Sequence, residues 1–102
     1  MDIERIRGWA WNVANKLIDV EETSGLERFL TDLRSSSLPH EFANTIVNTI
    51  TVFRKSGINL GEIPFDLQYF SNVTEFKEAK AVVLATLYNA MVRRETESKE
   101  EK

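Results

Sequence analysis

Apolar residues near the start of the chain recur at alternating spacings of three and four. This spacing places them on one face of a helix that spans residues 3–20. The members of this face are Ile3, Ile6, Ala10, Val13, Leu17 and Val20, and Trp9, Trp11 and Ile18 widen it. The pattern predicts a first amphipathic helix whose apolar side packs against the rest of the domain.

Two further helices follow, separated by polar breaks. The break at residues 21–24 offers Thr23 or Ser24 as the cap of a second helix that reaches about Ser35. Three serines then precede Pro39, which suits the first turn of a third helix over residues 39–56. The predicted core residues are Leu26, Phe29, Leu30 and Leu33 in the second helix, and Phe42, Ala43, Ile46, Val47, Ile50 and Phe53 in the third. Residues 45–52 are β-branched enough for a strand, but the helical spacing and the caps favour a helix.

The third helix is followed by Gly57, the residue type that most easily adopts the left-handed conformation at a helix end. Residues 57–71 combine turn residues with scattered apolar ones, which predicts a long connection packed over the core. Asn72 and Glu75 have the spacing of a capping box and begin a final helix that reaches about Arg94. Within it, residues 81–92 are apolar on nearly every side, which is typical of a central buried helix.

These patterns predict an all-α fold: one small bundle of four main helices with a long packed loop. The helical domain covers residues 1–94, and residues 95–102 form a disordered acidic tail. The length of 102 residues suits one hydrophobic core. We also expect an intracellular, cytoplasmic protein, because the chain has no secretion signal and no apolar run long enough to span a membrane.

The composition argues against catalysis. The chain has no cysteine, so a thiolate nucleophile and sulfur-based zinc sites are excluded. His40 is the single histidine and stands at the start of a helix, where a surface or capping role is expected. The glycines Gly57 and Gly61 lack the lysine spacing of a phosphate-binding loop. We therefore expect no enzymatic activity, no cofactor and no metal.

The charge distribution limits the class of binding partner. The net charge is −3, but residues 95–102 hold four acids and two bases, so residues 1–94 carry only −1. Proteins that coat duplex DNA on their own usually have a strongly basic domain. A local basic strip stays compatible with this balance.

Trp9 and Trp11 are two residues apart, so their side chains diverge by about 200° around a helix. They cannot both point into one core, and at least one is expected to be partly exposed. One alternative is that the exposed ring covers a core edge, helped by a cation–π contact with Arg7. The other is that it anchors a protein partner or stacks on a base.

The third helix has a polar face of Asn44, Asn48, Thr51 and Lys55 with almost no charge. Either these residues are simply solvated or hydrogen-bonded to a neighbouring helix, or the face meets a polar or phosphate-bearing surface. Basic residues elsewhere stand near helix ends. The candidate phosphate contacts are Lys16, Arg54, Lys55, Lys77 and Lys80, with Asn48 beside them.

In its size, its tryptophan-bearing first helix (residues 6–11), its long third helix and its alanine-rich last helix (residues 76–85), the chain resembles the small helical subunit of a CRISPR effector complex. The nearest kind is the small subunit of type I-A Cascade, a complex of antiviral defense. The resemblance implies a non-catalytic, RNA-guided role in which the chain contacts crRNA, target DNA or the displaced single strand without sequence preference. Its partners would be other subunits of the complex and copies of itself.

The alternative interpretation is a helical adaptor between proteins with no nucleic-acid role. Such an adaptor would use Trp11 or the segment of residues 57–71 as its anchor. The candidates for a protein interface are Trp9, Trp11, Tyr69 and Phe70.

Overall fold

The computed structural model describes residues 2–64 and 73–100, with side chains of the last helix described over residues 74–94. The described residues form four helices and no strand: α1 (Ile3–Asp19), α2 (Thr23–Ser35), α3 (Pro39–Lys55) and α4 (Val73–Glu100). The predicted all-α bundle is therefore confirmed. The helix α4 continues past the predicted end at Arg94, while disorder of residues 95–102 stays a prediction.

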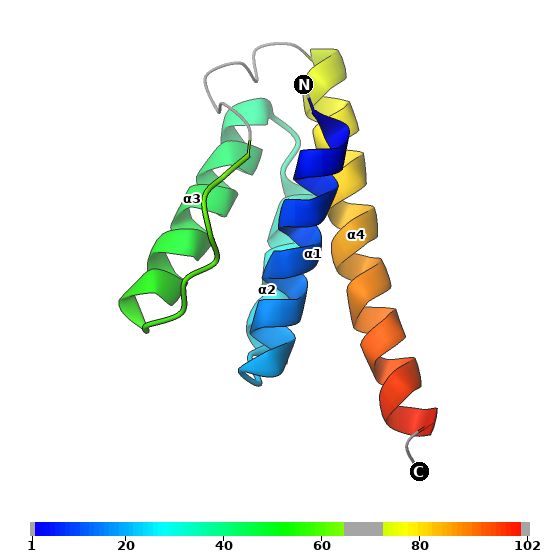
Figure 1. The fold of residues 1–102 in the computed structure, drawn as a ribbon. Helices are drawn as coiled ribbons and strands as arrows, with labels where there is room; N and C mark the ends of the chain where they lie inside the picture. Colours follow the sequence, from blue (N-terminus) through cyan, green and yellow to red (C-terminus); the bar gives the residue numbers. More distant parts are fainter. Residues whose placement is uncertain (1, 65–72, 101–102) are drawn as a thin grey trace.

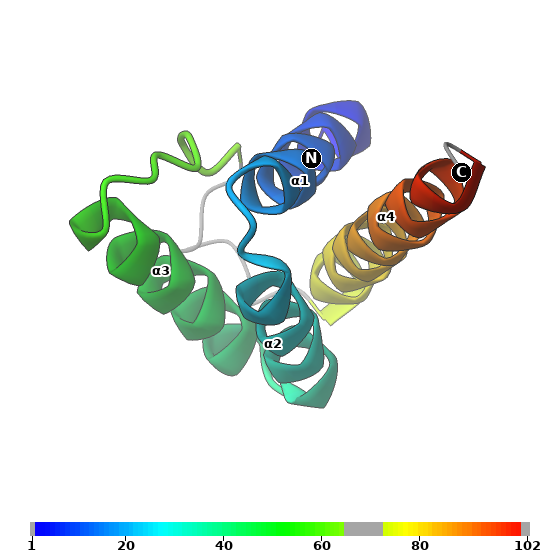
Figure 2. The same cartoon turned by 90° about the horizontal axis from the view of Figure 1, so that it is seen from below.

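The helices α1, α3 and α4 run in the same direction and α2 runs against them (Figure 1). Seen along the bundle, α1 and α2 stand between α3 on one side and α4 on the other (Figure 2). The most extensive interface joins α1 to α4. After α3, residues 57–64 lead back along this helix toward its starting end (Figure 1).

The helices α1, α2 and α3 bury most of the face that their apolar spacing predicts. The buried set is Ile6, Trp9, Ala10, Val13, Ala14, Leu17, Leu26, Phe29, Leu30, Leu33, Phe42, Ala43, Ile46, Ile50, Leu60, Phe76, Ala79, Val83, Leu87 and Ala90. Val20 and Val47 were expected in the core, but they are 43% and 40% exposed. Val20 lies beyond the end of α1, and Val47 lies on the flank of α3 that no other helix covers.

The same backbone motif closes α1 and α3. At the end of α3 the N–H of Gly57 donates to the carbonyl of Arg54, and the N–H of Ile58 donates to that of Phe53. Gly57 has a φ of 85°, as predicted for this position. At the end of α1 the equivalent left-handed residue is Glu21, with a φ of 62°.

The closure at Glu21 changes the predicted start of α2. The backbone N–H of Glu22 donates to the carbonyl of Leu17. Glu22 is also the N-cap of α2, although its side chain makes no capping hydrogen bond. Thr23 and Ser24 therefore lie inside the first turn, and the prediction that one of them caps α2 is wrong. The turn is too short to leave either residue outside the helix.

The connection after α3 packs onto the core over the part that is described. Leu60 is buried, and Ile58 and Ile63 are partly buried against the core. This confirms the predicted packed loop for residues 57–64. The predicted cap at Asn72 lies outside the described residues.

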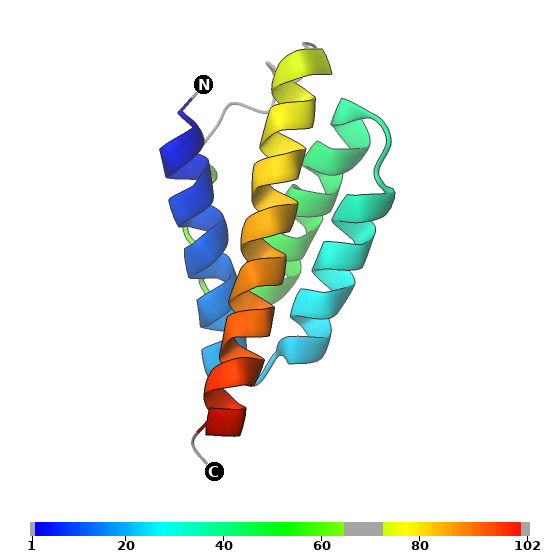
Figure 3. The same cartoon turned by 90° about the vertical axis from the view of Figure 1, so that its right-hand side faces the viewer.

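The helix α4 differs from the prediction of burial on nearly every side. Val83, Leu87 and Ala90 are buried, but Tyr88 is 55% and Val92 41% exposed. Figure 3 shows the reason: α4 lies along the surface of the bundle, so neighbouring helices cover only its inner side. No helix among the described residues is long and apolar enough to cross a membrane.

Candidate functional site

Five of the six residues predicted to contact nucleic acid are exposed. They are Lys16, Asn48, Arg54, Lys55 and Lys77. Lys80 is half-buried: its Nζ donates a hydrogen bond to the backbone carbonyl of Ser36 at 2.5 Å and stands 5.9 Å from the centre of the Phe76 ring. The ammonium of Lys80 thus ties α4 to the corner between α2 and α3, which is a structural task.

The structure does not bring the basic residues into one strip. Lys80 contacts Ser36, the C-cap of α2 three residues before the start of α3, whereas Arg54 and Lys55 end α3. At 1.5 Å per residue the two positions are about 25 Å apart along the bundle. Lys77 stands one turn from Lys80 and therefore belongs to the same end.

The outer face of α3 carries the predicted polar stripe. Asn44, Asn48, Thr51 and Lys55 are all exposed. The hydroxyl of Thr51 donates to the carbonyl of Val47 at 2.8 Å, so it bonds to its own helix and not to a neighbour. Within the described residues, the amides of Asn44 and Asn48 have no hydrogen-bond partner. We call these four residues, with the exposed Val47, the α3 face.

A shallow groove of about 490 Å³ separates the α3 face from α2. Asn48, Val52 and Ser56 line one wall, and Arg28 and Asp32 line the other. The floor includes Phe53, whose ring approaches Gly25 so closely that a Cβ there would lie 2.7 Å from Cζ. Gly25 is therefore the residue that allows α2 and α3 to close over this ring.

The two tryptophans divide as their spacing predicts. Trp9 is 7% exposed and belongs to the core, so it cannot serve as the predicted interface residue. Trp11 is 37% exposed. Its cation–π partner is Arg93 of α4, at 5.8 Å from the ring centre, and not Arg7 as expected. Arg7 instead pairs with Glu4.

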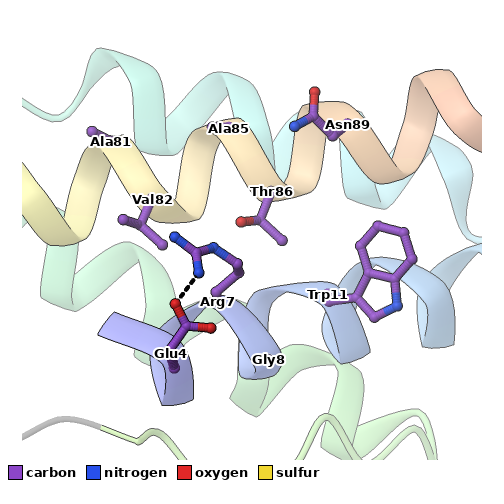
Figure 4. Close-up of a pocket in the computed structure, with 9 residues that line it drawn as sticks. All are labelled: Glu4, Arg7, Gly8, Trp11, Ala81, Val82, Ala85, Thr86 and Asn89. Carbon is purple, nitrogen blue, oxygen red and sulfur yellow. Dashed lines mark hydrogen bonds and ion pairs between the residues drawn. The ribbon is translucent and has the colours of Figure 1, made fainter. Parts of the chain in front are cut away.

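Trp11 stands at one end of a groove between α1 and α4 that the sequence patterns did not predict. The groove has a volume of about 600 Å³, and Figure 4 shows Val82 and Thr86 pointing from α4 toward α1. The lining residues are Glu4, Arg7, Gly8, Trp11, Ala81, Val82, Ala85, Thr86 and Asn89. The feature of the sequence that could have predicted this groove is the small size of Gly8, Ala81 and Ala85, because small residues leave space where two helices meet.

Other candidate residues add no site. Tyr69 and Phe70 lie outside the described residues. His40 is exposed in the first turn of α3. No group of three or more potential metal ligands occurs in the part of the chain that the structure describes.

Comparison with models of protein families, with curated proteins and with solved structures found no match for this chain.

Proposed function

We propose that this chain is a non-catalytic small subunit of a nucleoprotein assembly, similar in role to the small helical subunits of CRISPR effector complexes. Its α3 face contacts the backbone of crRNA or of a single DNA strand without reading sequence. The observation that carries the proposal is the α3 face itself, an exposed row of amides and a hydroxyl that ends in Lys55, with Arg54 next to it in the chain.

The chemistry of this face suits a sugar–phosphate backbone. No acidic residue occurs in α3 between Glu41 and Arg54, so no carboxylate of this stretch repels phosphate. The side chains of Asn44 and Asn48 can donate to phosphate or sugar oxygens. Within the described residues, Arg54 and Lys55 form no ion pair, so their charges are available for phosphate.

The affinity of one copy should be low. Two cations neutralise few phosphates, and residues 1–94 carry a net charge of −1. Binding would become tight only when the chain is held beside other subunits that also contact the same strand.

The test is fluorescence anisotropy with labelled single-stranded DNA and RNA of several sequences over a salt series. The double reversal Arg54→Glu/Lys55→Glu should weaken binding equally for all sequences and flatten the dependence of log K on log salt. The matched control is Arg5→Glu/Arg34→Glu, which changes the net charge equally on exposed residues of α1 and α2. If both doubles weaken binding equally, the effect is one of net charge and the α3 face is not the contact.

A second candidate function, a protein adaptor with no nucleic-acid role, is favoured by the exposure of Trp11 beside Arg93. Partly exposed aromatic residues at the edge of a groove are typical anchors for protein partners. Trp11→Ala should then weaken a purified native complex by about 2 kcal/mol or more. Such a complex would keep its affinity after nuclease treatment, whereas the nucleoprotein complex would not.

A further inference from the structure

The groove between α1 and α4 contains a buried threonine whose hydroxyl has no role in the described part of the fold. Thr86 is 7% exposed, and Figure 4 shows its side chain pointing from α4 into the space between the two helices. Within the described residues this hydroxyl forms no hydrogen bond, whereas those of Thr31, Thr45 and Thr51 each donate to a carbonyl of their own helix. A buried polar group without a partner is unfavourable, so Thr86 requires an explanation.

Gly8, on the α1 wall of the same groove, is also not explained by packing within the described residues. A glycine inside a helix makes that helix less stable than an alanine does. Gly8 has no positive φ, and a Cβ there would meet no atom of a neighbouring element within 4 Å. The absence of a side chain at Gly8 therefore serves neither the backbone nor the close packing of helices. Its effect is to leave space in the groove, opposite the equally small Ala85 of α4.

The lining of the groove determines which chemistry fits it. Its two formal charges, those of Glu4 and Arg7, neutralise each other in an ion pair. Val82 gives the α4 wall an aliphatic surface, and the indole ring of Trp11 closes one end. Arg93 lies over this ring at 5.8 Å from its centre and so helps to hold it in place. The groove thus offers apolar and aromatic contact, one buried hydroxyl and no unbalanced charge.

We propose that this groove binds a small, neutral, planar aromatic molecule that carries a hydrogen-bonding group on its edge. The ring lies against Trp11, since aromatic rings pack favourably in offset or edge-to-face arrangements. Its polar group bonds to the hydroxyl of Thr86, which can both donate and accept. The groove volume of about 600 Å³ is within the range of small-molecule sites, about 300–1,000 Å³. A charged ligand is disfavoured, because it would lose hydration without meeting an opposite charge.

Quinolinone is a suitable probe, because it is a neutral bicyclic ring with an N–H and a carbonyl on one edge. In an NMR titration of the isotope-labelled full chain, it should cause saturable shifts at the backbone amides of Gly8, Ala85 and Thr86 and at the indole N–H of Trp11. The matched control is naphthoate, a ring system of similar size with a negative charge, which should bind about tenfold more weakly. Shifts scattered over the surface, no saturation at millimolar concentration, or tighter binding of naphthoate would overturn the proposal.

Thr86→Val tests the hydroxyl, because it removes this group and keeps the shape of the side chain. Quinolinone binding should weaken about tenfold, as expected for one lost hydrogen bond. The urea midpoint of unfolding should stay the same or rise, since the described fold gives the hydroxyl no partner to lose. Thr31→Val on the exposed surface of α2 is the control and should leave binding unchanged. A lower midpoint for Thr86→Val with unchanged binding would show that the threonine is structural and would contradict the proposal.

Gly8→Leu tests the open space by filling it from the α1 side. It should abolish quinolinone binding and raise the urea midpoint, because leucine favours a helix more than glycine does and covers apolar surface. The rise in stability separates loss of the site from loss of the fold. Ala85→Leu fills the groove from the α4 side and should also abolish binding. Undiminished binding by either folded variant would place the ligand elsewhere and refute the site.

The same ring chemistry occurs in free heteroaromatic molecules and in the unpaired bases of a nucleic-acid strand, and binding of a single DNA strand distinguishes the two sources. If the groove takes a base, Gly8→Leu should weaken binding of a normal strand but not of a strand of abasic sites. If the ligand is a free molecule, Gly8→Leu should leave strand binding unchanged. Either result supports the groove as the site for the ring.

The site does not rest on the proposed contact between α3 and nucleic acid, and one variant separates the two. The reversal of Arg54 and Lys55 should leave quinolinone binding unchanged, since those residues end α3 on the other side of the bundle from α4. Loss of strand binding alone therefore concerns the α3 face. Loss of quinolinone binding in this folded variant would place the ligand on α3 and overturn the assignment to the groove.

Discussion

At the scale of single residues, α1 and α3 end in the same hydrogen-bonded motif but use different amino acids in the left-handed position. Gly57 adopts it at no steric cost, whereas a Cβ in this conformation is disfavoured by about 1–2 kcal/mol. Glu21 carries that strain. The left-handed conformation of Gly57 could be predicted from its residue type. That of Glu21 could not, because only the geometry of the turn forces a glutamate into this conformation.

We predict that Glu21→Gly stabilises the protein by about 0.5–1 kcal/mol and that Gly57→Ala destabilises it by about 1 kcal/mol. Both substitutions change strain at the same point of the same motif, in opposite directions. Urea unfolding followed by circular dichroism measures the two free energies. Changes of the same sign would show that the two turns are not equivalent.

Lys80 was predicted from its residue type to bind phosphate, but in the structure it has a structural role. Lys80→Met keeps the aliphatic stem beside Phe76 but removes the donor from the carbonyl of Ser36, which belongs to a buried residue. We expect a loss of about 1 kcal/mol in unfolding free energy. The exposed neighbour provides the control: Lys77→Met should change stability by less than about 0.5 kcal/mol.

At the scale of elements, the apolar periodicity and the capping residues predicted four helices, and each of them starts within about two positions of its predicted start. They could not predict how many neighbours each helix would have. The run at residues 81–92 has the composition of a buried helix, yet α4 packs against others on one side only. Val47 was assigned to the core for a similar reason, since its apolar side chain lies next to the true core line of α3.

The inner side of α4 should dominate its contribution to stability. Leu87 is fully buried, so Leu87→Ala should cost about 2–5 kcal/mol in unfolding free energy. Val52→Ala on α3 removes an apolar side chain that is 60% exposed and should cost less than about 1 kcal/mol. A loss below about 1 kcal/mol for Leu87→Ala would mean that α4 is peripheral to the core.

At the scale of the whole molecule, the direction of each helix decided which candidate residues meet. Because α3 and α4 run in the same direction (Figure 1), Lys77 and Lys80 near the start of α4 stand far from Arg54 and Lys55 at the end of α3. The basic residues can be identified in the sequence, but the relative directions of the helices cannot. Whether the basic residues form one continuous strip could therefore not be decided before the fold was known. By contrast, the divergence of Trp9 and Trp11 could be predicted, because it follows from the geometry of a single helix.

An ion pair joins the end of α1 to α4. Arg94 donates to Asp19 at 3.0 Å, and both side chains are about half-exposed. Exposed pairs contribute little because water screens them. Arg94→Ala should therefore lower the unfolding free energy by less than about 1 kcal/mol, and the difference should shrink in 1 M salt. A larger, salt-independent loss would indicate that Arg94 also packs.

The pairing of α1 with α4 also constrains how the chain folds as the ribosome makes it. The two helices share the most extensive interface, but residues 20–72 are translated between them. Nascent chains tend to fold one domain at a time, starting from the N-terminal end. Although α2 can cover part of α1 earlier, the part of α1 that packs on α4 stays uncovered until α4 has left the exit tunnel, so the core cannot be completed before then. A premature stop before residue 73 would therefore leave the cell with an unfolded, aggregation-prone fragment and not a three-helix version of the protein.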